Sequence, residues 1–259
     1  MKKITFKFSA TTFIILSMMA SCSEKYTSEV KEGITIVTNE DGATLGYSTE
    51  SGVAIIAQDR YAFKDLNKNG SLDSYEDWRL PVTERAKDLA SKMSLEDIAG
   101  LMLYSSHQSI PSGSRGYGSS VYNGKPFEES GAASSDLSDG QKKFLTDDHL
   151  RHVLITSVES PAVAAQWNNN AQAFAESLYL GIPVNTSSDP RHGSDSYAEF
   201  NAGAGGAISM WPGTLGIAAS FDPELMKQFG EIGSVEYRAL GITTALSPQI
   251  DLATEPRWS

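Results

Sequence analysis

The chain has 259 residues, of which 40% are hydrophobic and 20% are charged, a composition typical of a soluble globular protein. Its formal net charge of −11 repels phosphate backbones, which argues against general nucleic-acid binding but leaves neutral sugar ligands open. The single cysteine excludes an intramolecular disulfide.

The N-terminus predicts export and lipidation. Three lysines stand within the first seven residues, and the mostly apolar stretch 11–20 is too short to span a bilayer. Small residues then directly precede Cys22, which resembles a bacterial lipoprotein signal; the alternative is a plain secretory signal with a chance cysteine. We expect residues 1–22 to be a signal peptide with Cys22 lipidated. The protein would then be an exported periplasmic or cell-surface lipoprotein that meets the membrane through its lipid anchor alone.

Residues 23–80 are predicted to form a tether, short strands and a lead-in to a larger domain. The runs "ITIV" and "ATLGY" flank a turn at 39–42, which favours a short hairpin. The run "VAIIA" predicts a further extended segment shortly before the loop at 65–76.

The stretch "DLNKNGSLDSYE" has the ligand spacing of a calcium loop, with Gly70 at the sharp turn. The alternative is a plain Asn-Gly turn in a polar linker. Three carboxylates predict a modest affinity of roughly 10⁻⁴–10⁻³ M, and Pro81 follows too soon for a sensor's second helix. We therefore expect a structural calcium ion and no cofactor for catalysis. The predicted ligands are Asp65, Asn67, Asn69, Ser71, Asp73 and Glu76.

Residues 81–259 are predicted to form one α/β domain. A helix is expected after Pro81 over "VTERAKDLASKM", and the pair Ser94 and Asp97 predicts a capping box that starts a second helix over "SLEDIAGLM". The segment 105–140 is rich in Ser and Gly and has no sustained period, so it predicts a long polar loop.

From His152 onward, strand runs and helices alternate. The runs "HVLITSV", "IPVNTS" and "ITTALS" predict buried strands. One intervening helix begins at Pro161 and ends near Gly181; another is capped by Asp222 and ended by Gly241. This alternation predicts a parallel sheet covered by helices, with ligands at the carboxyl ends of the strands.

Three ordered motifs carry a resemblance to the N-terminal barrel of glycoside hydrolase family 3, the β-glucosidases and their relatives: "GIPVNTSSDPRHG", "WPGTLGIAASFDPELMKQFGEIGSVEYRALGI" and "LSPQIDLATEPRWS". The lead-in resembles that of many bacterial members, so the similarity runs from about Tyr61 to Ser259. It implies a (β/α)8 TIM barrel. The 177 residues from Thr83 onward fall short of the roughly 250 of a closed barrel, so we expect about its first half, a fragment poorly stable and inactive alone.

The resemblance implies an exported retaining β-glycosidase acting on oligosaccharides, most closely a β-glucosidase that releases terminal β-linked glucose from them or from β-glucans. β-Xylosidase, N-acetyl-β-glucosaminidase and broader β-glucan exohydrolase activities stay open within the family. A non-catalytic glycan-binding lipoprotein and a calcium-binding surface protein stay open outside it. The family's nucleophile is an aspartate in a Ser-Asp-Trp context on a later strand, and its acid/base follows later still. Neither motif occurs here, so no catalytic residue is expected within this chain.

By the same resemblance, three residues are candidates for substrate binding. Asp189 would hold sugar hydroxyls in the −1 subsite, a role that suits a carboxylate. His192 would line or brace the same pocket, or else hold its loop through a backbone hydrogen bond. Arg257 lies in a Pro-Arg-Trp motif, where pairing with a carboxylate is the alternative to a sugar contact. Trp211 and Trp258 are candidates for stacking on sugar rings, with packing as the default role of a tryptophan.

Overall fold

The computed structural model describes residues 24–112, 121–188 and 208–246. The expected signal peptide, 1–22, with its Cys22, lies outside these ranges. Among the helices that the structure describes, none has the length and apolar character needed to cross a bilayer.

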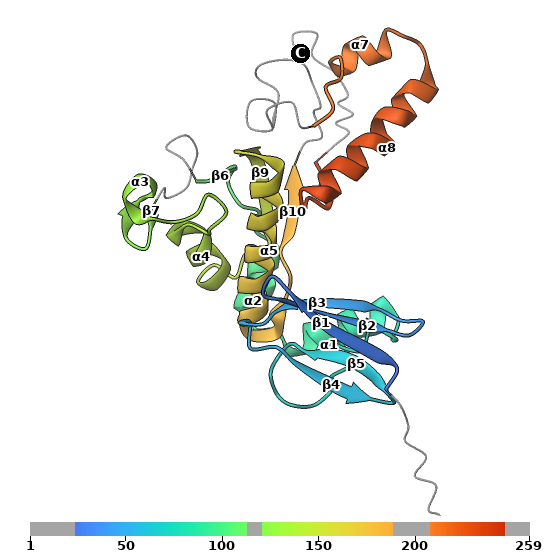
Figure 1. Ribbon diagram of the computed structural model, residues 1–259, viewed down its shortest axis with the longest axis vertical. Helices are drawn as coiled ribbons and strands as arrows, with labels where there is room; N and C mark the ends of the chain where they lie inside the picture. Colours follow the sequence, from blue (N-terminus) through green and yellow to red (C-terminus); the bar gives the residue numbers. More distant parts are fainter. Residues whose placement is uncertain (1–23, 113–120, 189–207, 247–259) are drawn as a thin grey trace, which may run out of the picture.

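The first part of the chain forms two antiparallel sheets, seen in blue and cyan in Figure 1. The strands are β1 (Tyr26–Lys31), β2 (Ile34–Asn39), β3 (Thr44–Ser48), β4 (Ala54–Gln58) and β5 (Tyr61–Asp65). One sheet has the order β1-β2-β3, and β4 pairs with β5. The β2–β3 pairing confirms the predicted hairpin. Strand β1 lies where a tether was expected. The sequence did not predict it, because "YTSEVK" shows no alternation of apolar residues and is exposed at five of its six positions.

The buried side chain of Asn39 joins the two sheets. Its Nδ2 donates to the Ala62 carbonyl at 3.2 Å, and its Oδ1 accepts from the Ala62 N–H at 2.7 Å. The side-chain amide of Asn39 thus makes the pair of hydrogen bonds that a neighbouring strand would make with the Ala62 backbone. Trp78 adds a second link, because its Nε1 donates to the same carbonyl at 3.0 Å while its ring stacks on Phe63 at 5.5 Å. The lead-in is therefore one packed unit.

Two helices follow the lead-in, as predicted. They are α1 (Val82–Lys92) and α2 (Leu95–Leu101). The capping box of α2 is confirmed: Ser94 Oγ accepts from the Asp97 N–H at 3.0 Å, and Asp97 Oδ2 accepts from the Ser94 N–H at 2.9 Å. Asp97 Oδ1 also lies 2.6 Å from His149 Nδ1, so this cap connects α2 to a distant part of the chain.

The Asp97 cap makes the free energy of unfolding depend on pH in the acidic range. Burial raises the pKa of Asp97, but the hydrogen bonds from Ser94 and His149 together lower it by more. The pKa of Asp97 therefore lies below its ordinary value. A depressed carboxyl pKa stabilises the fold above the unfolded value of about 3.9, and this is lost as pH falls through the folded pKa. We expect Asp97→Ala to lower the free energy of unfolding by about 1 kcal/mol at pH 7, and by less at pH 3.

Urea denaturation at both pH values measures this difference. Glu96→Ala, which removes an exposed carboxylate from the same helical turn, is the control and is expected to have the smaller effect at pH 7. An equal loss for Asp97→Ala at both pH values would contradict the role given to its charge.

A four-stranded parallel sheet forms the centre of the molecule. Its strands are β6 (Gln108–Ile110), β9 (His152–Val158), β10 (Asn185–Ser188) and β11 (Thr244–Ala245). The order is β11-β10-β9-β6, with every neighbouring pair parallel. The predicted α/β class with a helix-covered parallel sheet is thereby confirmed.

The segment 105–140 is more structured than the predicted polar loop, and that prediction is wrong for the stretches that form strands and helices. It contains β6, β7 (Val121–Tyr122), β8 (Lys125–Pro126), α3 (Phe127–Ser130) and the start of α4 (Asp139–Thr146). Strand β6 has three residues and begins with the buried Gln108, so it carries no readable apolar period. Its place depends on pairing with β9, which sequence alone does not reveal.

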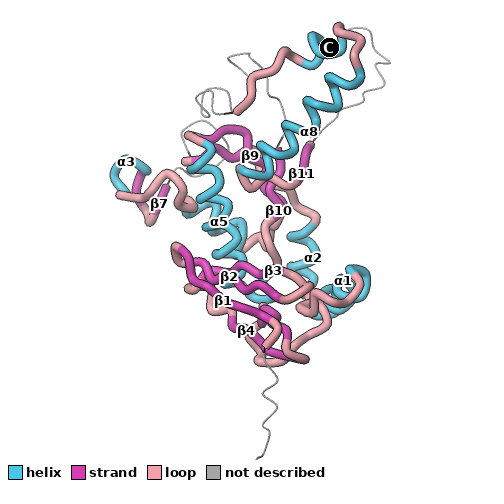
Figure 2. The backbone as a smooth tube through the Cα atoms, turned by 45° about the vertical axis from the view of Figure 1, so that its right-hand side comes forward, coloured by secondary structure: helices cyan, strands magenta, loops and turns pink. Residues whose placement is uncertain are grey.

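Helix α5 (Pro161–Ser177) packs on the sheet and carries the main core (Figure 2). Trp167 is 1% exposed, and its Nε1 donates to Gln141 Oε1 at 3.1 Å, which ties α5 to α4. The helix was expected to run to near Gly181 but ends at Ser177. A short 3-10 turn, η1 (Tyr179–Gly181), follows it.

The last described helices lie at the upper end of Figure 1. They are α7 (Thr214–Ala218) and α8 (Pro223–Ala239). The predicted ends of α8 are confirmed: Asp222 accepts from two backbone N–H groups of the first turn, and Gly241 follows the helix with φ +86°. A Cβ at Gly241 would lie 2.5 Å from Cγ of Asn168 on α5, so close packing as well as backbone conformation requires glycine there.

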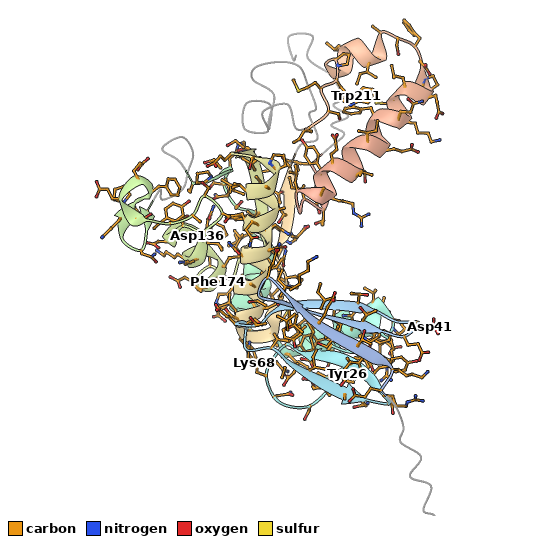
Figure 3. All side chains as sticks on the ribbon, viewed as in Figure 1. Tyr26, Asp41, Lys68, Asp136, Phe174 and Trp211 are labelled. Atoms are coloured by element: carbon orange, nitrogen blue, oxygen red, sulfur yellow. The ribbon has the colours of Figure 1, made fainter. Side chains whose placement is uncertain are left out.

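Two lysines of the lead-in hold the C-terminal end of α5. Lys64 forms an ion pair with Glu176, and Lys68 Nζ donates to the carbonyls of Glu176 and Ser177 at 3.0 and 3.2 Å. Figure 3 labels Lys68 near the lower end of α5. Cations suit this position because the last carbonyls of a helix are unsatisfied and carry partial negative charge. The lead-in and the sheet layer are thus in direct contact.

Candidate functional site

The carboxyl end of β10 is the first candidate position, because ligands of parallel α/β folds bind at such ends. Ser187 and Ser188 are fully buried there, and their hydroxyls donate to the Val153 and Ile155 carbonyls of β9 at 3.1 and 2.6 Å. The strand is thus held by side chains as well as by its backbone ladder. Asp189 follows Ser188 directly in the sequence, so the residue before Asp189 is held to β9 by a side-chain hydrogen bond.

The three predicted sugar-binding residues lie outside the described residues. They are Asp189, His192 and Arg257, and Trp258 lies outside as well. Their roles stay predictions. Trp211 is described: its Nε1 donates to Ser209 Oγ at 3.0 Å, and its ring meets Phe229 edge-on at 5.5 Å. These contacts support packing against α8 as its role.

A polar network crosses the amino ends of the strands, which sequence reasoning did not single out. Asn185 Nδ2 lies 3.0 Å from His152 Nδ1, and Asn185 Oδ1 accepts from Thr244 Oγ1 at 2.7 Å. Ser187, farther along β10, also contacts the Tyr104 hydroxyl. The Asn185 network joins β9, β10 and β11 at the end opposite to the one where ligands bind in such folds, so its arrangement indicates a structural role. A polar residue at the first position of β9, β10 and β11 is the signal that marks it.

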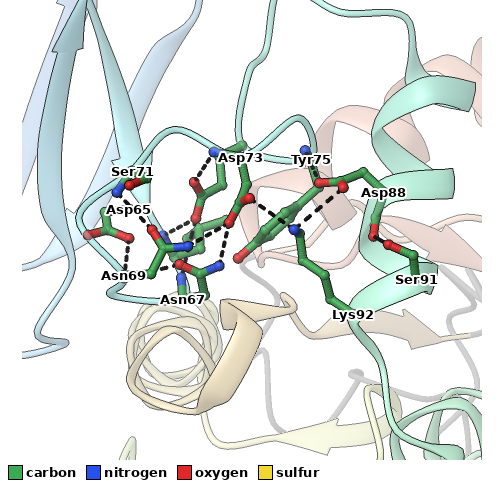
Figure 4. A network of polar contacts seen from close by, with 11 residues as sticks. Asp65, Asn67, Asn69, Ser71, Asp73, Tyr75, Asp88, Ser91 and Lys92 are labelled. Carbon is green, nitrogen blue, oxygen red and sulfur yellow. Dashed lines mark hydrogen bonds and ion pairs between the residues drawn. The ribbon is translucent and has the colours of Figure 1, made fainter.

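The second candidate is the acidic loop, defined as residues 65–76 (Figure 4). Asp65 and Glu76 are each 4% exposed, and both carboxylates accept backbone N–H groups of the loop itself. Asp65 Oδ2 receives the Gly70 N–H at 2.9 Å, and Glu76 Oε2 receives the Asp73 N–H at 3.0 Å. Gly70 has φ +76°, as the predicted sharp turn requires.

Asp73 is the meeting point of the loop's side chains. Its Oδ2 accepts from Asn67 Nδ2 at 2.6 Å and from Asn69 Nδ2 at 2.9 Å, while its Oδ1 pairs with Lys92 Nζ at 2.9 Å. Burial raises the pKa of Asp73, but the hydrogen bonds from Lys92 and the two amides bring it below its ordinary value. Lys92 also lies 3.5 Å from Asp88 Oδ1, one turn earlier on α1.

Tyr75 adds an unusual group to the acidic loop. Its side chain is 5% exposed, and its hydroxyl is buried without a hydrogen-bond partner among the described residues. Burial and the charge of Glu76 raise the pKa of this phenol above its ordinary value.

The six predicted ligands thus share one compact loop. Across the described part of the chain, no three His, Cys, Asp or Glu side chains form a group ready to hold a metal ion. Calcium binding stays a prediction.

Comparison with known proteins places the sequence among glycosidases. The family model described as the glycosyl hydrolase family 3 N terminal domain matches residues 127–259. A periplasmic beta-glucosidase/beta-xylosidase of Dickeya chrysanthemi is 42% identical over 208 residues, covering 80% of this chain and 29% of that protein.

More distant relatives carry similar names. A probable beta-glucosidase C of Aspergillus oryzae is 35% identical over 196 residues, 74% of this chain and 28% of its own length. A putative beta-xylosidase of Formosa agariphila is 25% identical over 186 residues, 71% of this chain and 21% of its own length. The chain therefore spans less than a third of each of these relatives.

Proposed function

Because this chain belongs to glycoside hydrolase family 3, we propose that it forms the N-terminal part of an exported retaining β-glycosidase. The preferred reaction is release of terminal β-linked glucose from oligosaccharides or β-glucans. The observation that carries the proposal is the family match over 127–259, together with the 42% identical relative named a beta-glucosidase/beta-xylosidase. β-Xylosidase is the second candidate activity, since that name includes it and another relative is named a putative beta-xylosidase.

The proposal includes a (β/α)8 barrel. Support comes from the order β11-β10-β9-β6, in which each strand lies beside the strand of the same sheet that precedes it in the chain, as consecutive strands of a barrel do. Further support comes from α5 and α8, each of which precedes the next strand of the sheet. Strands β6, β9, β10 and β11 would then be the first four of eight.

In this proposal the chain supplies substrate binding, and the two catalytic carboxyl groups come from later segments. Asp189 would accept hydrogen bonds from two neighbouring sugar hydroxyls at the mouth of the barrel. The buried Ser187 and Ser188 support this role, because their hydrogen bonds to β9 fix the strand end that leads into Asp189. His192 and Arg257 would contact or brace the same subsite.

Assays of the full-length enzyme on aryl β-glucosides and aryl β-xylosides test the proposed reaction. We expect hydrolysis of the glucoside to be faster, with the β-anomer of the sugar as the first product seen by NMR. Hydrolysis of neither substrate would overturn the proposal. Reading the coding frame past codon 259 separates the non-catalytic alternative: continuation into a Ser-Asp-Trp motif supports the enzyme, and a stop codon supports a glycan-binding lipoprotein.

We also propose that the protein is anchored by lipid at Cys22. The name of the periplasmic relative supports export, while the anchor itself depends on the N-terminal sequence. Cys22→Ala is expected to move the protein from the membrane fraction to the soluble fraction of its host, because a lipid chain would be its sole membrane contact. Labelled fatty acid should be incorporated by the wild type and not by the variant. Membrane association that is unchanged in Cys22→Ala would exclude the anchor.

A further inference from the structure

The acidic loop contains a polar atom that is left without a hydrogen bond. Tyr75 Oη is the one buried side-chain nitrogen or oxygen without a partner in residues 24–112, 121–188 and 208–246. Buried hydroxyl groups nearly always find a partner, in the protein or in an ordered water, because leaving one unpaired costs free energy. Figure 4 shows the Tyr75 ring reaching toward the side of the loop where Asn67 and Asp73 meet. The unpaired hydroxyl therefore indicates that a water or ligand occupies the loop and pairs with it.

Three other side chains already converge on that place. Asn67 Nδ2 and Asn69 Nδ2 both lie within 2.9 Å of Asp73 Oδ2. Asn67 Oδ1 now accepts from the Asn69 N–H at 3.2 Å, and Asn69 Oδ1 from the Ser71 N–H at 2.7 Å. Rotating each amide by half a turn would exchange these two bonds for two more oxygens at the same point. The convergence of these three side chains then supplies oxygen ligands for a cation.

The charge at this point is already compensated by a cation. Lys92 Nζ lies 2.9 Å from Asp73 Oδ1 and 3.5 Å from Asp88 Oδ1. A metal ion at the centre of the loop would take over Asp73 and leave Lys92 its pairing with Asp88. Lys92 and the metal ion therefore compete for one carboxylate.

We propose that the acidic loop binds one Ca²⁺ ion, and that a metal-bound water supplies the missing hydrogen bond of Tyr75 Oη. The ligand chemistry favours Ca²⁺ because the loop offers only hard oxygen donors, without Cys or His. Mg²⁺ is disfavoured, since it demands near-ideal octahedral geometry and sheds its waters reluctantly. The ligands are the side chains of Asp65, Asn67, Asn69, Asp73 and Glu76 and the backbone carbonyl of Ser71.

This site is independent of the proposed glycosidase activity. It lies in the lead-in, before the part of the chain that the family model matches, and no catalytic group is involved. Its test therefore needs no substrate.

Calorimetric titration of the full-length protein with CaCl₂, and in parallel with MgCl₂, measures the site directly. We expect one equivalent of Ca²⁺ with a dissociation constant of roughly 10⁻⁴–10⁻³ M, and weaker binding of Mg²⁺. The melting temperature should rise with CaCl₂, since the ligand binds only the folded state. Asp65→Ala should abolish both the heat and the rise.

Two further variants separate the proposed contacts from a merely structural loop. Lys92→Met should bind Ca²⁺ about 2–5-fold more tightly, because the competing ammonium is removed. Lys87→Met is the matched control, an exposed lysine on the same helix, and should leave the affinity unchanged. Tyr75→Phe should weaken Ca²⁺ binding, yet without Ca²⁺ it should melt no lower than the wild type, because the hydroxyl it removes has no partner.

The result that overturns the site is an absence of heat in the wild type at millimolar CaCl₂, with a melting temperature that CaCl₂ does not change. The loop would then be a turn closed by Lys92. Binding that is identical in wild type and Tyr75→Phe would overturn the water-mediated role of the hydroxyl. Should Asp65→Ala fail to fold, the Lys92→Met and Tyr75→Phe titrations still decide both points.

Discussion

Asp189→Ala is expected to lower kcat/KM of the full-length enzyme on an aryl β-glucoside by about 10²-fold or more, equivalent to about 2.7 kcal/mol of transition-state stabilisation. A carboxylate accepts two charge-assisted hydrogen bonds from neighbouring hydroxyls, and these tighten as the sugar ring flattens toward an oxocarbenium-like transition state. The loss should therefore fall on kcat as well as on KM. Steady-state kinetics with the purified variant measures both.

Two companion variants make the result specific. Asp189→Asn should recover part of the loss, because its amide oxygen still accepts one hydrogen bond. Asp148→Ala, which removes an exposed aspartate before the amino end of β9, is the control and should behave like the wild type. A folded Asp189→Ala enzyme with unchanged kcat/KM would remove this residue from the substrate site.

Trp167→Ala is expected to lower the free energy of unfolding by about 3–5 kcal/mol, the second large effect. Trp167 is 1% exposed and belongs to the main core cluster, so its removal leaves a large cavity that the close-packed neighbours cannot fill. The loss should appear as a lower melting temperature in calorimetry, at a calcium concentration held constant between variants.

The two functions of Trp167 can be separated. Trp167→Phe keeps most of the ring but loses the N–H that donates to Gln141 Oε1. That oxygen still accepts from the Ser138 N–H at 3.0 Å, so we expect only about 1 kcal/mol of loss from the missing hydrogen bond. Trp211→Ala is the comparison, since Trp211 is half-buried and should cost less. Equal losses for Trp167→Ala and Trp211→Ala would contradict the placement of the core.

Features encoded within a few neighbouring residues were predictable from the sequence. The caps at Ser94 and Asp222 form through hydrogen bonds that span at most three residues, and both are present. The long apolar run at 152–158 also predicts strand β9, which is present. Strand β6 was missed because its three residues have no period and their strand conformation depends on β9. Strand β1 was missed because an exposed strand carries little apolar signal.

The candidate sites divide in the same way. The ligand spacing of the acidic loop was legible because all its residues lie within one short stretch of the sequence. The contact with Lys92 was not, since it joins residues 19 apart and depends on how α1 packs. The direction of the Tyr75 hydroxyl likewise depends on tertiary packing. At the carboxyl end of β10 the sequence indicated the strand and the polar residues beyond it, while the bonds from Ser187 and Ser188 to β9 required the sheet pairing.

The lysine contacts at the end of α5 connect the order of synthesis with the order of assembly. Lys68 reaches carbonyls that lie 108 and 109 residues later in the chain. The ribosome releases the lead-in first, so its lysines are available when the last turn of α5 emerges. A circular permutation that placed residues 24–80 after the strands of the sheet in the sequence would preserve each of these bonds in the final structure. It would nevertheless leave the carbonyls of α5 to water until synthesis was complete, and folding would have to wait for the lead-in.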